Sequence, residues 1–242
     1  MRETWKTFYQ NYRNKVAETE SELFIQVGRT VGGQPISREE FQRGVQHVVD
    51  TLKLEPDDVV FEYCCGNGLV TFEIAPLVKR VIGIDFTDHM VASARRLRQR
   101  ENVTYHAGDA LLPIIPLIGA LNPTKYLMSY ALAHFEPEGL TTILEHALDA
   151  SPRGSFTFLA TGIPDRDRAR NFYNTPERQA RQRHNKETGN MFNDGVGRWW
   201  HANELVDVGH QCGLQVSVMP EPDGLANYRM DVLFRRIGSN DS

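Results

Sequence analysis

A short glycine-containing turn that follows an apolar run has the clearest chemical potential in the sequence. Residues 59–63 have the composition of a buried strand, and the turn at residues 64–68 follows at once. A strand, a tight glycine turn and a helix bring the backbone close to a ligand at the carboxyl end of a sheet. Gly66 and Gly68 leave room for that approach, although a lone Gly-x-Gly is also common in ordinary turns.

Two acidic residues follow the next two strand-like runs. Asp85 ends residues 81–85, where its carboxylate can accept hydrogen bonds from both hydroxyls of a ribose. Asp109, between Gly108 and Ala110, can receive an exocyclic amino group. Alone, Asp85 could be a charge at a helix N-terminus and Asp109 a turn residue. Together with the glycine turn, these strand ends could hold an amino-acid moiety, a ribose and an adenine in one crevice.

In these segments the sequence resembles the class I S-adenosylmethionine-dependent methyltransferases. Residues 62–68 match the first motif of that family, residues 81–85 the second and residues 108–110 the third, and the likeness covers about residues 45–160. The resemblance implies S-adenosylmethionine as cofactor and S-adenosylhomocysteine as product. It puts Glu62 and Gly66 near the methionine portion, Asp85 on the ribose, Phe86 and Met90 beside the adenine, and Asp109 and Ala110 at its edge. The predicted cofactor-binding residues are Tyr12, Glu62, Cys64, Gly66, Gly68, Asp85, Phe86, Met90, Gly108, Asp109, Ala110 and Tyr130.

One position departs from the family pattern, because Cys64 stands where glycine is usual. A small side chain is accommodated there if its backbone angles are ordinary. Cys64 and Cys65 are interpreted as small buried residues rather than nucleophiles or metal ligands, and no metal site is predicted. Two alternatives stay open. A nicotinamide-dependent oxidoreductase would need a third glycine where Thr71 stands, and a non-catalytic S-adenosylmethionine-binding module would need no acceptor pocket.

The acceptor side is predicted from a histidine and an aromatic segment. His134 follows the fourth strand-like run and, as in similar enzymes, would face the acceptor as a general base, a role that contributes about 10²–10⁴ in rate. A structural histidine at a helix start is the alternative. Other candidate substrate-binding residues are Arg166, Trp199, Trp200 and His201. His201 could instead cap the following helix, the tryptophans could pack a core, and the arginines of residues 165–183 could form a solvated helix face.

The elements that must position these residues alternate along the chain. Strand-like runs lie at residues 59–63, 81–85, 103–105, 126–130 and 155–160, and helical patterns lie at residues 37–52, after the glycine turn to about 78, 87–100 and 136–150. Alternation of this kind predicts an α/β fold with a doubly wound, mostly parallel sheet and helices on both faces. Residues 216–219 and 228–234 have no helix between them, so they complete seven strands as an antiparallel C-terminal hairpin at the sheet edge.

The length, charge and apolar stretches of the sequence limit the class of protein to which it can belong. The 242 residues fit a single Rossmann-like domain, with an N-terminal helical cap (1–36, including one amphipathic helix over 1–27) and a lid-like insertion (163–200). A net charge of −4 argues against general affinity for nucleic acid or anionic lipid. Neither a signal peptide nor a stretch of 18 apolar residues is found. We therefore expect a cytoplasmic enzyme, monomeric or homodimeric, that methylates a sugar-like or secondary-metabolite-like small molecule, with no nucleic-acid or membrane partner.

Overall fold

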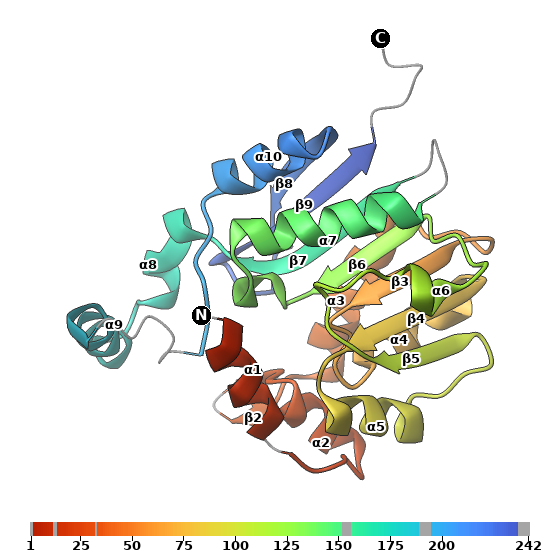
Figure 1. Ribbon diagram of the computed structural model, residues 1–242. Coiled ribbons are helices and arrows are strands. Elements are labelled where there is room, and N and C mark those ends of the chain that lie inside the picture. The colour runs from red at the N-terminus through yellow and green to blue at the C-terminus, as the bar shows by residue number, and fades with distance from the viewer. Residues whose placement is uncertain (1, 12–13, 32, 152–155, 189–194, 237–242) are drawn as a thin grey trace.

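The protein is described by a computed structural model over residues 2–11, 14–31, 33–151, 156–188 and 195–236. Its centre is a seven-stranded sheet in the order β5-β4-β3-β6-β7-β9-β8. The strands are β3 (Val59–Tyr63), β4 (Arg80–Asp85), β5 (Val103–Ala107), β6 (Lys125–Ser129), β7 (Thr157–Pro164), β8 (Leu214–Pro220) and β9 (Arg229–Arg236). The first five are parallel, and β9 is antiparallel to both of its neighbours. This confirms the predicted sheet and its terminal hairpin (Figure 1).

Helices cover both faces of the sheet because the central strands are apolar on both sides. In β3, Phe61 and Tyr63 point to one apolar core and Val60 to the other. The first core includes residues of α6 (Ile115–Ile118), α7 (Pro137–Ala150) and α10 (Ala202–Gln211). The second includes residues of α2 (Glu20–Gln26), α3 (Arg38–Leu52), α4 (Leu69–Ile74) and α5 (Asp88–Leu97). In Figure 1, α7 and α10 lie together across the same face.

The strand order reverses beside β3. The chain builds β4 and β5 outward on one side of β3, and then returns to place β6 on the other side. The loops after β3 and β6 therefore diverge in opposite directions. In a parallel sheet this divergence opens a crevice at the carboxyl ends of the strands.

Two helix predictions need correction. Residues 1–27 do not form one helix, because α1 (Arg2–Asn11) ends well before α2 begins. Thr19 starts α2 through a capping box, in which its side chain accepts from the Glu22 amide and the Glu22 carboxylate accepts from the Thr19 amide. The helix expected to reach about residue 78 is shorter: α4 gives way to the 3₁₀ turn η1 (Ala75–Leu77), because proline at position 76 cannot donate a helical hydrogen bond.

The stretch predicted as an insertion is largely helical where it is described. Its first two residues, 163–164, belong to β7; the elements η3 (Arg166–Arg168), α8 (Ala169–Phe172) and α9 (Pro176–Thr188) follow. In Figure 1, α9 projects away from the sheet. Small elements complete the described chain: β1 (Thr30–Val31), β2 (Gln34–Pro35) and η2 (Leu132–His134). Among the described residues, none of the helices is both long and apolar enough to span a bilayer.

Candidate active site

A cavity lies at the carboxyl ends of β3, β4 and β6, where the strand order reverses. It holds about 1080 Å³ of empty space, its mouth included, which is ample for a small ligand. The predicted cofactor-binding residues that line it are Glu62, Cys64, Gly66, Asp85, Phe86, Met90, Gly108, Asp109, Ala110 and Tyr130. Gly68 does not line it, and Tyr12 lies outside the described residues. The fold thus gathers segments that are well separated in the sequence.

The turn after β3 is held in a left-handed conformation. Cys64 has a φ of 54°, so the condition of ordinary backbone angles is not met at this position. The Gly66 amide donates to Asp85 Oδ2 at 2.9 Å, which ties the turn to the end of β4. Gly68 has φ 77°, and a Cβ there would lie 2.5 Å from the Tyr105 hydroxyl oxygen. Gly68 is therefore required for packing of the turn against β5.

Asp85 is buried, yet it borders the cavity. One carboxylate oxygen accepts from the Gly66 amide and the other from the Thr87 amide at 2.8 Å. Burial raises the pKa of Asp85, although these two backbone hydrogen bonds oppose the shift. A carboxylate oxygen has two lone pairs, so each can accept a further hydrogen bond beside the one from the backbone. The side chain therefore has the acceptor capacity that a pair of ribose hydroxyls would use.

Glu62 lies deeper, at the end of β3, with 2% of its surface exposed. The Thr71 hydroxyl donates a short hydrogen bond to one of its oxygens. Burial raises the pKa of Glu62 to about 8, against the opposing effects of Thr71 and the Arg29 charge. Thr71 thus stands where a dinucleotide-binding turn would carry glycine, and here its side chain holds the carboxyl group that borders the cavity.

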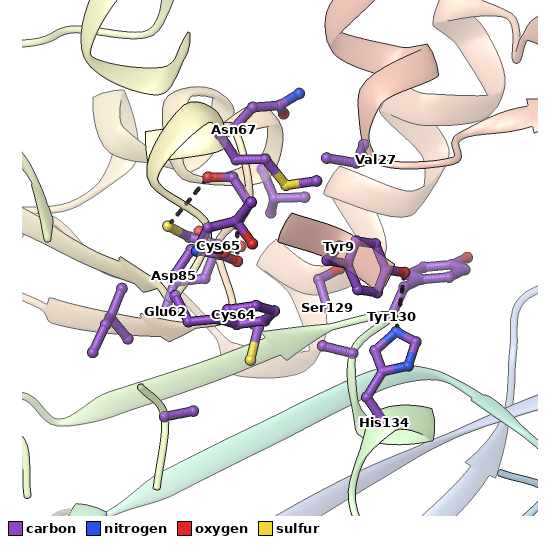
Figure 2. Close-up of a pocket in the computed structure, with 18 of the residues that line it drawn as sticks. Tyr9, Val27, Glu62, Cys64, Cys65, Asn67, Asp85, Ser129, Tyr130 and His134 are labelled. Carbon is purple, nitrogen blue, oxygen red and sulfur yellow. Dashed lines mark hydrogen bonds between the residues drawn. The ribbon is translucent and has the colours of Figure 1, made fainter. Parts of the chain in front are cut away.

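His134 lines the opposite wall, together with a residue of the N-terminal helix. Its Nε2 lies 3.2 Å from the Tyr9 hydroxyl oxygen, and Figure 2 shows the hydrogen bond that joins the two side chains at this wall of the cavity. Burial lowers the pKa of His134 to about 4, so the imidazole is neutral near pH 7. A neutral imidazole can accept a proton, although so low a pKa makes it a weak base.

Several cavity residues were missed by the sequence analysis because no local pattern marks them. Arg29 follows α2, and its guanidinium carbon lies 3.6 Å from the centre of the Tyr130 ring. Lys6 of α1 forms an ion pair with Asp109 at 3.4 Å. Asn67 donates to the Leu23 carbonyl and so attaches the glycine turn to α2. These contacts join segments far apart in the sequence, and single-sequence motifs carry no signal for them.

The predicted substrate-binding residues other than His134 lie away from this cavity. Trp200 has no exposed surface; its Nε1 donates to the Leu132 carbonyl within the core. Trp199 packs against the rings of Phe172 and Tyr228. His201 precedes α10 and its amide donates to Glu204. These contacts are those of the packing and capping alternatives. Arg166 and the other described residues of 165–200 likewise do not line the cavity.

Comparison with known proteins identifies one domain within the chain. Residues 60–153 match the family described as "Methyltransferase domain". The 23S rRNA (uracil(1939)-C(5))-methyltransferase RlmD of Photobacterium profundum is 28% identical over 133 residues, which cover 53% of this chain and 26% of that protein. RlmD of Xanthomonas euvesicatoria pv. vesicatoria is 35% identical over 71 residues, or 28% of this chain and 16% of that protein. The match thus spans about a quarter or less of these relatives' length.

Solved structures resemble the chain over nearly its whole length. Magnesium protoporphyrin IX methyltransferase (ChlM) from Synechocystis PCC 6803 with bound SAM gives a TM-score of 0.61 at 14% identity, covering 98% of this chain and 97% of the other. The N-methyltransferase NodS from Bradyrhizobium japonicum WM9 with S-adenosyl-L-homocysteine gives 0.60 at 14% identity, covering 94% and 97%. The DhpI-SAM-HEP complex gives 0.61 at 16% identity, covering 96% of each chain.

At 14–16% identity the structural likeness establishes the fold alone. The family match adds that residues 60–153 form a methyltransferase domain. The matched residues include the glycine turn after β3 and Asp85 at the end of β4. Residues 60–153 therefore carry a methyltransferase domain, and the chain has the fold of the class I S-adenosylmethionine-dependent methyltransferases.

Proposed function

We propose that this enzyme methylates a small-molecule acceptor, of a sugar-like or secondary-metabolite-like kind, within the cavity at the carboxyl ends of β3, β4 and β6. The observation that carries the proposal is the convergence of Glu62, Gly66, Asp85 and Asp109 on one cavity. Their donor and acceptor groups fit the cofactor: the buried Asp85 carboxylate would accept from ribose hydroxyls, and the glycine turn leaves the backbone accessible to an amino-acid moiety. The sulfonium cofactor supplies an electrophilic methyl group when it is bound.

The protein's own contribution is alignment and the handling of a proton. We assign the methionine portion to Glu62 and Gly66, the ribose to Asp85, and the adenine to Phe86, Met90, Asp109 and Ala110. Holding donor and acceptor in line contributes roughly 7–11 kcal/mol to the lowering of the barrier. We assign the removal of the acceptor's proton to neutral His134, which lines this cavity. The side chains of Tyr9 and His134 narrow the cavity, which favours an enclosed small acceptor over a polymer.

We further propose one domain with residues 1–36 as a cap and residues 163–200 as an accessory segment. Tyr9 and Lys6 support the cap, because both line the cavity. A lid role for residues 163–200 finds no such support in the described part of that segment. The curated relatives named above act on RNA, so RNA is the acceptor that the proposal must exclude by experiment.

Calorimetric titration with S-adenosylmethionine, S-adenosylhomocysteine and NADH is the first test. We expect micromolar binding of the two sulfur compounds and a loss of about tenfold or more in Asp85→Ala, with Asp88→Asn as an exposed acidic control on α5. Binding of NADH alone would overturn the assignment. Transfer of labelled methyl groups to a metabolite extract, and none to total RNA, would support a small acceptor; the reverse result would contradict it.

A further inference from the structure

A second cavity adjoins the cofactor cavity, and the two share part of their walls. Arg29, Val70, Ser129 and Tyr130 line both. The second cavity holds about 890 Å³ of empty space, its mouth included. One wall is formed by the apolar side of α3 and by Ile36 just before it. Another wall is formed by the segment that joins β8 to β9. Its apolar lining includes Ile36, Phe41, Val45, Val48 and Leu225. A molecule in this cavity is separated from the cofactor cavity by a single layer of side chains.

Tyr130 is the main part of that layer, and several contacts hold it in an uncommon conformation. It has a φ of 58°, a left-handed conformation that non-glycine residues seldom adopt. Its hydroxyl donates a short hydrogen bond to Glu221, and the guanidinium carbon of Arg229 lies 5.1 Å from its ring centre. A Cβ at Gly162 would lie 2.5 Å from the ring, so only glycine leaves it this space. Backbone strain maintained by such surroundings is characteristic of functional sites.

Two polar groups at this cavity have hydrogen-bonding capacity that no described residue uses. Arg29 lies against the Tyr130 ring, but its guanidinium forms no hydrogen bond or ion pair with any part of the chain that is described. Glu221 is 8% exposed, and its Oε2 is buried with no hydrogen-bond partner among those same residues. Burial raises the pKa of Glu221. Oε2 of Glu221 therefore keeps the capacity to accept a hydrogen bond from a molecule bound in this cavity.

Asp231 lines the same cavity but, unlike Glu221, has a partner for each of its two carboxylate oxygens. It has no exposed surface; Oδ1 accepts from the Gly162 amide at 2.7 Å, and Oδ2 lies 2.7 Å from His47 Nε2. Both oxygens are used, and they attach β9 to β7 and to α3. Asp231 is therefore a structural residue. Arg229 donates one hydrogen bond from Nη1 to the Gly162 carbonyl, so the contacts left for a ligand are its other N–H groups, the Arg29 guanidinium and Oε2 of Glu221.

The balance of charge identifies the kind of ligand. Arg29 and Arg229 face Glu40, Glu221 and Asp231 in this lining, so the cavity has no excess of positive charge with which to bind a polyanion. A molecule that carries one anionic and one cationic group matches the two guanidinium groups and the free carboxylate oxygen. The apolar side of α3 suits a hydrocarbon or aromatic body.

We propose that the second cavity is a ligand site distinct from the place of methyl transfer and that it takes a small amino acid with an apolar body. Its carboxylate is bound by Arg29 and Arg229, and its amino group donates to Oε2 of Glu221. This site goes beyond the proposed function, because its ligand lies behind the Tyr130 side chain and outside the cofactor cavity.

The test uses three probes that share one body: L-phenylalanine, phenethylamine without the carboxylate, and 3-phenylpropionate without the amine. Each is titrated by calorimetry into the chain saturated with S-adenosylhomocysteine. We expect phenylalanine to bind about tenfold or more tightly than either partial probe. In Glu221→Gln, phenylalanine and phenethylamine should both lose about tenfold or more in affinity, while 3-phenylpropionate is unaffected, because a charge-assisted hydrogen bond is removed and the acceptor for the Tyr130 hydroxyl is kept.

Controls separate this idea from the proposed function. Glu39→Gln removes an exposed carboxylate of α3 outside the cavity and should change nothing. Arg229→Gln, checked for folding by its Tm, should weaken phenylalanine and 3-phenylpropionate but not phenethylamine. No binding of any probe, equal binding of all three, or competition between phenylalanine and S-adenosylhomocysteine would overturn the proposal. Failure of the proposed function appears separately, as absent S-adenosylhomocysteine binding, and phenylalanine titration of the free chain still tests the cavity.

Discussion

Tyr9 and His134 meet edge to face, with their ring centres 5.2 Å apart and the Tyr9 hydroxyl oxygen 3.2 Å from His134 Nε2. The contact joins α1 to η2 across 125 positions of sequence and forms one wall of the cofactor cavity. Opening of this wall would require α1 to separate from η2. The same contact contributes to the burial that keeps the His134 imidazole neutral.

His134→Ala is expected to lower kcat by about 10²–10⁴ if this imidazole removes the acceptor's proton, because that is the usual contribution of a positioned base. Steady-state kinetics with an identified acceptor provide the measurement. Tyr9→Phe serves as the matched variant, since it keeps the ring contact and removes only the hydroxyl. Turnover of His134→Ala within threefold of the wild type would remove His134 from the role of base.

The lowered pKa of His134 also predicts a pH dependence of stability. The folded state holds this residue neutral down to about pH 4, whereas the unfolded chain protonates it near 6.5. The unfolded state therefore binds more protons between these values, and the free energy of unfolding falls as the pH is lowered through that window. His134→Gln should show a smaller loss from pH 7 to pH 4.5 in urea titrations. Parallel pH profiles for the two proteins would contradict the buried, neutral state.

Cys64 provides a test of ligand position in the cofactor cavity. Its side chain is half-buried and lines the cavity, whereas Cys65 is fully buried and Cys212 lies on another part of the molecule. S-adenosylhomocysteine should therefore slow alkylation of Cys64 by iodoacetamide and leave Cys212 unaffected, as read by mass spectrometry of peptides. Equal labelling of Cys64 with and without the ligand would show that the bound molecule does not reach this turn.

The left-handed conformation of Cys64 gives a prediction of stability as well. A non-glycine residue at such a φ costs roughly 1–2 kcal/mol, and glycine costs about 0.5–1 kcal/mol in unfolded-state entropy. Cys64→Gly should thus raise the free energy of unfolding by up to about 1 kcal/mol. Gly68→Ala should lower it by more than that amount, because its Cβ would meet the Tyr105 ring. Chemical denaturation of both variants checks the pair; similar effects of the same sign would refute the contrast.

The order of strands and the cofactor cavity could be predicted from the sequence because local patterns encode them. Alternating apolar runs and helical patterns predict the parallel sheet, and strand ends of a parallel sheet meet at one edge, so Gly66, Asp85 and Asp109 had to converge. The acceptor side has no such rule. Trp200 is hydrophobic enough for either a core or a pocket, and its burial is decided by the packing of η2 and α10. Arg29 and Glu221 lie far apart in the sequence, and only the folded chain brings them to the same cavity.

Cofactor binding should release protons through Glu62. Burial raises its pKa to about 8, so near neutral pH the free protein holds this carboxyl largely protonated. The ammonium group of the methionine portion, placed beside it, favours the ionised form and lowers that pKa. Binding of S-adenosylhomocysteine at pH 7 should therefore release part of a proton. Calorimetry in phosphate and in Tris, whose ionisation enthalpies differ, measures the number of protons released. The affinity should also weaken by up to about tenfold per pH unit as the pH falls below 8.

Glu62→Gln should abolish both effects, while Glu39→Gln, on the exposed face of α3, should retain them. An unchanged proton release in Glu62→Gln would assign the linkage to another group and separate Glu62 from the methionine portion.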